Sequence, residues 1–166
     1  MAFAMDQRLS APDRVQSALS AAGVEARIQE FPSSTRTAQE AAAAVGTTVG
    51  QIVKSLVFLA GDAPVLALVS GANRLDTARL GALTGAPIGK ADADAVRQAT
   101  GYAIGGVPPT GFPSPIPTFI DRDLLQYDVV WAAAGTPRHV FPIAPGELVR
   151  LTSGRLADLR LIEPAP

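Results

Sequence analysis

One stretch of the chain reads Gln51-Ile52-Val53-Lys54-Ser55-Leu56-Val57-Phe58-Leu59, an apolar run that a single lysine interrupts. Gly61 and Asp62 follow as a hairpin signal, and residues 64–70 are again mainly apolar. The two runs therefore predict a β-hairpin over residues 54–60 and 64–70.

Lys54 needs an explanation because an unpaired ammonium is expensive to bury. Two interpretations stay open. The apolar stem of the lysine can pack in the strand while its head reaches solvent. Alternatively, the ammonium binds an anionic substrate.

A second informative segment lies about fifty residues later and reads Gly101-Tyr102-Ala103-Ile104-Gly105-Gly106-Val107-Pro108-Pro109-Thr110-Gly111. Two adjacent glycines let backbone N–H groups come close to a ligand. The purely structural interpretation of this loop is a tight turn before a proline-rich edge over residues 108–117. Taken with Lys54, the loop predicts a small pocket that binds an anionic substrate and acts on it through backbone groups.

Helical and extended patterns alternate along the rest of the chain. Thr37 and Glu40 form a capping-box pattern before an alanine-rich helix. The sequence predicts a single α+β domain over residues 1–166, with a mixed, largely antiparallel sheet. Helices are predicted over residues 11–22, 38–45, 76–83, 92–100 and 145–151, a helical turn over 48–53, and further strands over 24–31, 87–90, 118–120, 128–133 and 140–143.

Composition narrows the function classes. The 166 residues are 48% hydrophobic, which suffices for a core, and the absence of cysteine excludes disulfides and thiol catalysis. Residues 1–14 lack the apolar segment of a signal peptide, and no run approaches a membrane span, so we expect a cytoplasmic protein without membrane contact. A net charge of −1 argues against coating of nucleic acid, although it permits binding of an RNA end.

Several familiar catalytic arrangements are missing from the sequence. His139 is the only histidine, and neither a nucleophile elbow nor a phosphate-binding glycine loop is present. No ligand cluster of the usual spacing can be drawn, so we expect no metal and no cofactor. The acidic pairs Asp92/Asp94 and Asp121/Asp123 are more readily explained by a helix start and a strand end than by catalysis.

Taken in order, six segments resemble the family of bacterial deacylases that edit mischarged tRNA, which includes the YbaK protein and the editing domain of prolyl-tRNA synthetase. The resemblance covers residues 12–155. Its most specific marks are Lys54 and the G-x-x-x-P motif from Gly105 to Pro109. The matching segments are residues 37–40, 51–56, 101–109, 117–121, 134–135 and 145–148.

The resemblance implies a central sheet curled towards a barrel and surrounded by helices. It also implies hydrolysis of an aminoacyl ester at the 3′ acceptor end of tRNA, assisted by the terminal ribose hydroxyl. Lys54 would hold the terminal phosphate, and the N–H groups of Gly105 and Gly106 would bind the ribose or the developing oxyanion. Gly135 would form the opposite wall, and Pro109 completes the substrate-binding motif.

Specificity is implied by four further positions. Cysteine-removing members carry a serine and an aspartate where this chain has Ala133 and Val140, and alanine-specific members often carry asparagine where it has Ser55. His139 is expected at the rim. We therefore expect a free-standing trans-editing enzyme for tRNA-Pro carrying alanine or 2-aminobutyrate. A Cys-tRNA(Pro) deacylase, a non-catalytic aminoacyl-tRNA binder and a subunit that needs a synthetase partner stay open.

Overall fold

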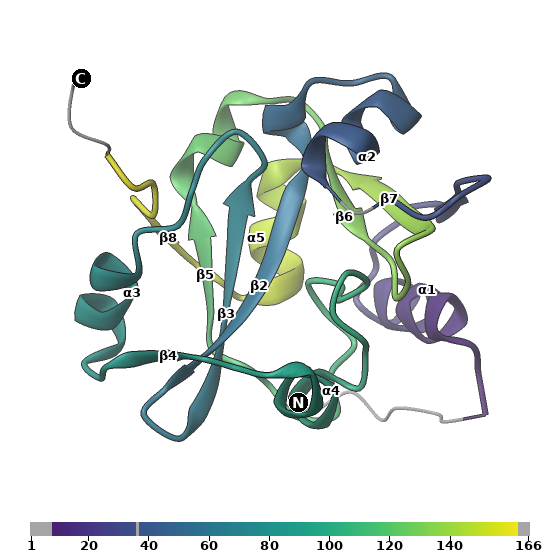
Figure 1. Cartoon of the computed structure of the whole chain (residues 1–166). Coiled ribbons are helices and arrows are strands. Elements are labelled where there is room, and N and C mark those ends of the chain that lie inside the picture. The colour runs from purple at the N-terminus through teal and green to yellow at the C-terminus, as the bar shows by residue number, and fades with distance from the viewer. Residues whose placement is uncertain (1–7, 36, 163–166) are drawn as a thin grey trace.

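The computed structural model of the chain describes residues 8–35 and 37–162. Within them the chain forms five α-helices and eight strands, which divide into two sheets (Figure 1). The helices are α1 (Ala11–Ala21), α2 (Ala38–Val45), α3 (Thr77–Thr84), α4 (Ala93–Thr100) and α5 (Pro145–Thr152). The strands are β1 (Gln29–Glu30), β2 (Val53–Ala60), β3 (Ala63–Ser70), β4 (Ile88–Lys90), β5 (Thr118–Asp121), β6 (Val130–Ala133), β7 (His139–Ile143) and β8 (Arg155–Ala157).

The larger sheet has the strand order β4-β2-β3-β5-β8. Its middle is the predicted hairpin, in which Lys54 lies opposite Val69 and Ala60 lies opposite Ala63. β4 pairs antiparallel with β2, whereas β5 runs parallel to β3 and β8 runs parallel to β5. The sheet is therefore mixed, as expected.

The smaller sheet, in the order β1-β7-β6, is entirely antiparallel. It meets the larger sheet where Ile52 forms an isolated parallel bridge with Trp131. The side-chain Nε2 of Gln51, in the 3-10 turn η1 (Val49–Gln51), donates to the carbonyl of Val129 at 3.0 Å. This junction places the first residues of β2 beside β6.

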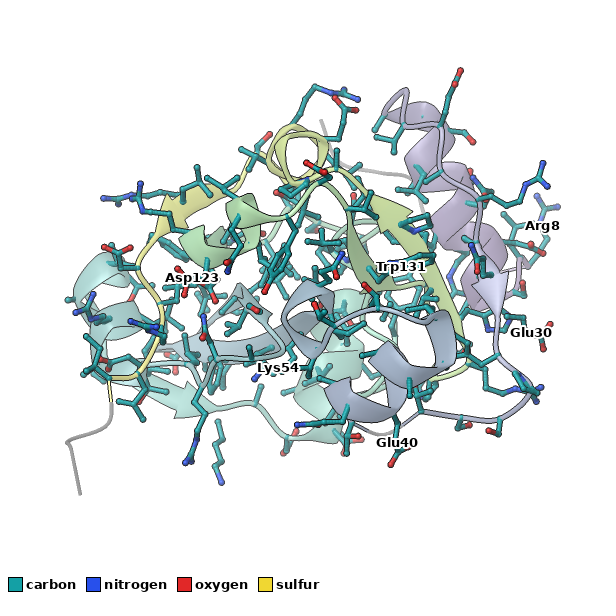
Figure 2. The ribbon with its side chains drawn as sticks, turned by 90° about the horizontal axis from the view of Figure 1, so that it is seen from above. Arg8, Glu30, Glu40, Lys54, Asp123 and Trp131 are labelled. Atoms are coloured by element: carbon teal, nitrogen blue, oxygen red, sulfur yellow. The ribbon has the colours of Figure 1, made fainter. Side chains whose placement is uncertain are left out.

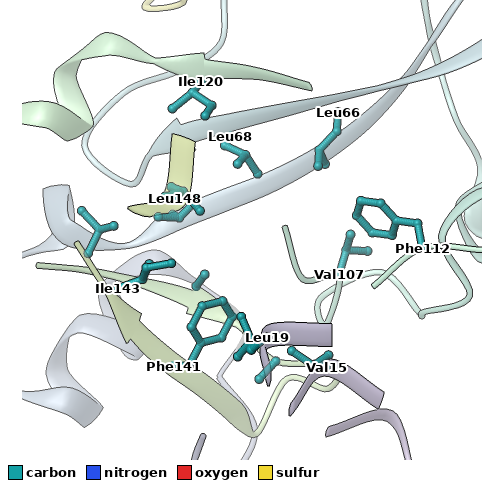
Figure 3. Packing of buried hydrophobic residues seen from close by; sticks show 14 of the residues in the cluster. Val15, Leu19, Leu66, Leu68, Val107, Phe112, Ile120, Phe141, Ile143 and Leu148 are labelled. Carbon is teal, nitrogen blue, oxygen red and sulfur yellow. The ribbon is translucent and has the colours of Figure 1, made fainter. Parts of the chain in front are cut away.

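β3 is the centre of the core because both of its faces are buried. Leu66 and Leu68 belong to the cluster that α1, β7 and α5 complete (Figure 3). Val65 and Val69 face the opposite side, where Leu80 of α3 covers them. Burial on both faces explains why this segment reads as a continuous apolar run rather than an alternating one.

The α+β class and the mixed sheet are confirmed. The expected strand over residues 24–31 is wrong in extent, because only Gln29 and Glu30 pair, with β7. Its alternation instead records burial, since Val24 is buried and Ala26 and Ile28 pack partly against the core. β8 and the 3-10 helix η2 (Arg122–Gln126) were not expected, since neither segment carries a recognisable period.

Two expectations are not settled by the fold. The described strands form two sheets and no closed barrel, so the curl towards a barrel is not confirmed. The single domain over residues 1–166 stays a prediction, and its ends, residues 1–7 and 163–166, lie outside the described residues, as does residue 36. No described helix is both long and apolar enough to pass through a bilayer.

Candidate active site

A pocket of about 370 Å³ lies at the junction of the two sheets, between the start of β2, α2, the β6–β7 pair and the loop before Val107. We call it the Lys54 pocket. In Figure 2 Lys54 lies near the middle of the molecule, with Trp131 to one side and Asp123 to the other. The pocket is lined by Thr35, Thr37, Ala38, Ala41, Ile52, Val53, Lys54, Ser55, Leu56, Ile104, Gly105, Val107, Trp131, Ala133, Thr136, Pro137, His139 and Val140.

The pocket brings together six of the nine residues that the sequence nominated. Three of the nine, Gly106, Pro109 and Gly135, are buried and do not line it. The sequence did not nominate Thr136 or Trp131, because neither residue type marks a site without its neighbours in space. The six that line the pocket are Lys54, Ser55, Gly105, Ala133, His139 and Val140.

Lys54 reaches the pocket from β2, and its ammonium donates a hydrogen bond to the backbone carbonyl of Asn73. Burial lowers the pKa of Lys54 below its ordinary value of 10.5. The negative charge of Asp121 opposes this decrease, and the positive charge of Arg74 adds to it. Lys54 is the only lysine or arginine among the described lining residues, so it is the cation available to an anionic ligand there.

A polar cluster beneath Lys54 was missed by sequence reasoning. The Asn73 side-chain amide donates to Asp121 Oδ2 at 2.9 Å and to Asp123 Oδ2 at 2.8 Å. Asp121, which is 1% exposed, also accepts the N–H of Ser70 at 3.0 Å and that of Asp123 at 3.0 Å. The sequence showed an acidic pair at a strand end, but it could not show that a turn fifty residues earlier folds onto it.

Gly105 forms the third position of a turn in which the N–H of Gly106 donates to the carbonyl of Ala103 at 3.1 Å. Its φ of +94° is a backbone conformation that glycine adopts without strain. Among the described residues the Gly105 N–H has no hydrogen-bond partner, whereas that of Gly106 is already used within the turn. The Gly105 N–H is therefore one of the available backbone donors on the pocket wall, together with those of Ile104 and Val107 in the same loop.

Gly106 and Gly135 pack backbone against backbone. The Gly135 N–H donates to the carbonyl of Gly106 at 2.9 Å, and Gly135 has a φ of +102°. A Cβ on Gly106 would lie 2.6 Å from the Cα of Thr136 and 2.7 Å from the carbonyl carbon of Gly135. These two glycines thus set the distance between the Gly105 turn and the β6–β7 turn.

The wall opposite β2 is apolar and comes from β6 and β7. Ala133 and Val140 are direct partners in the antiparallel register, so they present one continuous small surface.

On β2 itself, Ser55 contributes a hydroxyl that is buried and has no hydrogen-bond partner among the described residues. A buried hydroxyl without a partner costs free energy.

His139 lines the pocket, and its ring contacts two neighbouring side chains. Its Nδ1 is 2.6 Å from the Thr136 hydroxyl, and its Nε2 is 3.9 Å from a Glu30 carboxylate oxygen. Arg138 also reaches the Glu30 carboxylate, at 3.4 Å. His139 lines the pocket, and both its expected position at the rim and its contact with substrate stay predictions.

Metal ligands are not gathered anywhere in the described part of the chain. No group of three or more histidine, cysteine, aspartate or glutamate side chains suited to a metal ion is found there. What the Lys54 pocket offers is a half-buried ammonium, a backbone donor, a hydroxyl and an apolar wall.

The fold and the pocket together define a small α+β protein whose cationic pocket lies between two sheets. Comparison with known proteins identifies the class more closely. Residues 32–151 match the family model of the aminoacyl-tRNA editing domain, a span that contains every residue lining the pocket. The chain belongs to this family.

The similar proteins agree with that assignment. A crystal structure described as that of a proposed trans-editing enzyme for prolyl-tRNA synthetase is 52% identical, covers 92% of this chain and 99% of that chain, and superposes with a TM-score of 0.89. The proposed Cys-tRNA(Pro)/Cys-tRNA(Cys) deacylase EbsC of Enterococcus faecalis is 28% identical over 124 residues, 74% of this chain and 76% of that protein. The proline–tRNA ligase of Streptococcus sanguinis is 30% identical over 113 residues, 67% of this chain but 18% of the ligase.

Proposed function

We propose that this protein is a trans-editing hydrolase that cleaves the aminoacyl ester of mischarged tRNA at the 3′ acceptor end. The observation that carries the proposal is the meeting of Lys54 and the Gly105 turn in one pocket of suitable size. Membership of the aminoacyl-tRNA editing family supports the same reaction, as does the description of the 52% identical relative as a proposed trans-editing enzyme.

The chemistry suits a site without a strong nucleophile. An aminoacyl ester is already activated, so the pocket has to fix the acceptor end and stabilise the oxyanion that forms when water attacks. Lys54 holds the terminal phosphate, and the unpaired N–H of Gly105 donates to the oxyanion or to the terminal ribose. The ribose hydroxyl of the substrate assists the attack.

The amino acid removed is proposed to be small and aliphatic, namely alanine or 2-aminobutyrate carried by tRNA-Pro. The support is the apolar wall of Ala133 and Val140. A pocket of this kind discriminates poorly between neighbours in size, because one methylene is worth about 1–3 kcal/mol. We therefore expect a preference of about tenfold over cysteine, which corresponds to about 1.4 kcal/mol.

The experiment compares initial rates of deacylation on one tRNA-Pro charged with alanine, 2-aminobutyrate, cysteine or proline. Faster release of alanine or 2-aminobutyrate than of cysteine, with proline retained, is expected. A clear preference for cysteine would show that the assignment of the apolar wall is wrong.

Cys-tRNA(Pro) is the second candidate substrate, and one observation favours it. Ser55 lines the pocket, and its buried hydroxyl has no hydrogen-bond partner among the described residues, so a turn of this side chain towards the pocket would let it bind a thiol. Ser55→Ala separates the two candidates: it should lower the rate on the cysteine substrate selectively if Ser55 reads the thiol, and should leave the ratio of the alanine and cysteine rates unchanged if it does not.

Binding without hydrolysis, and activity only on a docked synthetase, are tested by the same substrates. Retention of every amino acid by the isolated protein, followed by release once prolyl-tRNA synthetase is added, would identify a synthetase-dependent subunit. Retention in both conditions with measurable tRNA binding would identify a binding module.

A further inference from the structure

The ammonium of Lys54 does not stand alone in the pocket, because its hydrogen-bond acceptor is itself fixed. That acceptor is the backbone carbonyl of Asn73, in the turn that follows β3. The turn starts at Ser70, whose hydroxyl donates to the carbonyl of Gly50 at 2.7 Å. The backbone of the turn is therefore tied to the segment that leads into β2.

The side of the turn facing β5 is held by Asp121. One oxygen of this carboxylate accepts the Ser70 N–H at 3.0 Å and the Asn73 side-chain amide at 2.9 Å, so it grips the turn at two points three residues apart. The other oxygen accepts the Asp123 N–H at 3.0 Å. Because β5 lies parallel and adjacent to β3, the carboxylate sits at the end of the sheet next to the turn.

We propose that Asp121 is the positioning residue for Lys54 and acts through Asn73. Asp121 fixes the Asn73 carbonyl that orients the ammonium, and it supplies a negative charge behind that carbonyl. Asp123 shares the Asn73 amide at 2.8 Å, and Arg74 is the cation that acts against the charge of Lys54. The placement of the ammonium is a property of the structure alone, while its effect on turnover rests on the proposed function.

The chain itself provides a direct probe, since it contains two lysines, Lys54 and Lys90. Labelling lysine with ¹³C therefore gives two Cε signals, which Lys90→Arg assigns. Titration of these signals in the full-length protein reports the charge state of Lys54 without any substrate.

Asp121→Asn keeps the shape of the side chain while removing its charge and one of its two acceptor oxygens. We expect the Lys54 signal to titrate at lower pH than in the unchanged protein, because the attraction that opposes burial is lost. Turnover of the mischarged tRNA should fall by up to about a hundredfold, as expected when a catalytic group is misplaced. Asp158→Asn is the matched control, since Asp158 is an acid whose side chain is 69% exposed and pairs with Arg122, and it should change neither reading.

Asn73→Ala separates the effect of the position of the Lys54 ammonium from the effect of the Asp121 charge. It also provides a test if Asp121→Asn does not fold. It cuts the link to the backbone carbonyl but keeps Asp121, so turnover should fall while the Lys54 signal moves less than in Asp121→Asn. The proposal is overturned if folded Asp121→Asn shows the Lys54 titration of the unchanged protein, or if folded Asn73→Ala keeps full turnover. If the unchanged protein releases no amino acid, the proposed function fails, yet the titration still decides whether Asp121 controls Lys54.

Discussion

Burying the charged ammonium of Lys54 by half lowers the stability of the folded protein, and the groups around it offset part of this cost. The segment around it is otherwise apolar, and burial disfavours its charged form. The surrounding carbonyl of Asn73 and the carboxylate of Asp121 recover part of the cost. Lys54 lines the pocket, and binding of an anion by its ammonium stays a prediction.

The pH dependence of stability follows from the lowered pKa of Lys54. Between that lowered value and 10.5, the unfolded chain binds more protons than the folded one, so this residue makes the free energy of unfolding rise as the pH rises. Compared with Lys54→Met, the unchanged protein should therefore gain stability as the pH rises towards 10.5. Urea unfolding of both proteins across this pH range measures the difference in their free energies of unfolding. A difference that stays constant, or that falls as the pH rises, would contradict the prediction.

At the scale of elements, the hairpin β2–β3 and all five helices were predictable within one or two residues. Ser10, Thr37 and Asp92 act as helix caps, and glycines end α2 and α4, so the local signals are strong. The strand at β1 was predicted too long and β8 was missed, because segments of two or three residues are too short to show a periodic pattern. Pairings such as β3 with β5 depend on residues fifty positions apart, which no local pattern records.

The contact between the Gly105 turn and the β6–β7 turn makes a prediction about Gly106. Gly106→Ala would place a methyl group against the backbone of Thr136 and Gly135, which cannot rotate away. We expect a loss of about 1–3 kcal/mol in the free energy of unfolding, together with loss of turnover. Gly89→Ala is the control, because a Cβ there meets nothing within 4 Å. Equal stability of the two variants in urea unfolding would show that the turns are free to separate.

Across the whole molecule, the sequence identified residues that meet in one pocket but not the polar cluster that holds the Asn73 turn. Six nominated residues do meet in one pocket, because the family motifs identify positions that the fold brings together. The cluster of Asn73, Asp121 and Asp123 could not be predicted, since its members are ordinary turn and strand-end residues until the chain folds. Only the distances between these side chains in the folded protein reveal the cluster.

The net charge of −1 predicts weak dependence on salt. A protein that holds only the acceptor end neutralises one or two phosphates, so the logarithm of affinity for tRNA should fall with the logarithm of salt concentration with a slope of about −1. Binding measured by fluorescence anisotropy at several salt concentrations gives this slope. A slope of about −4 or steeper would show that an extended surface contacts the tRNA stem.

If the Lys54 pocket hydrolyses the aminoacyl ester, as we propose, the rate of amino-acid release must depend on Lys54. Alanine release from mischarged tRNA-Pro is measured for the unchanged protein, for Lys54→Ala and for Lys90→Ala, the exposed second lysine of the chain. We expect Lys54→Ala to fold normally and to lose about a hundredfold or more in rate, while Lys90→Ala keeps the full rate. Near-normal release by a well-folded Lys54→Ala protein would contradict the account, because the reaction would then not depend on the cation that defines the pocket.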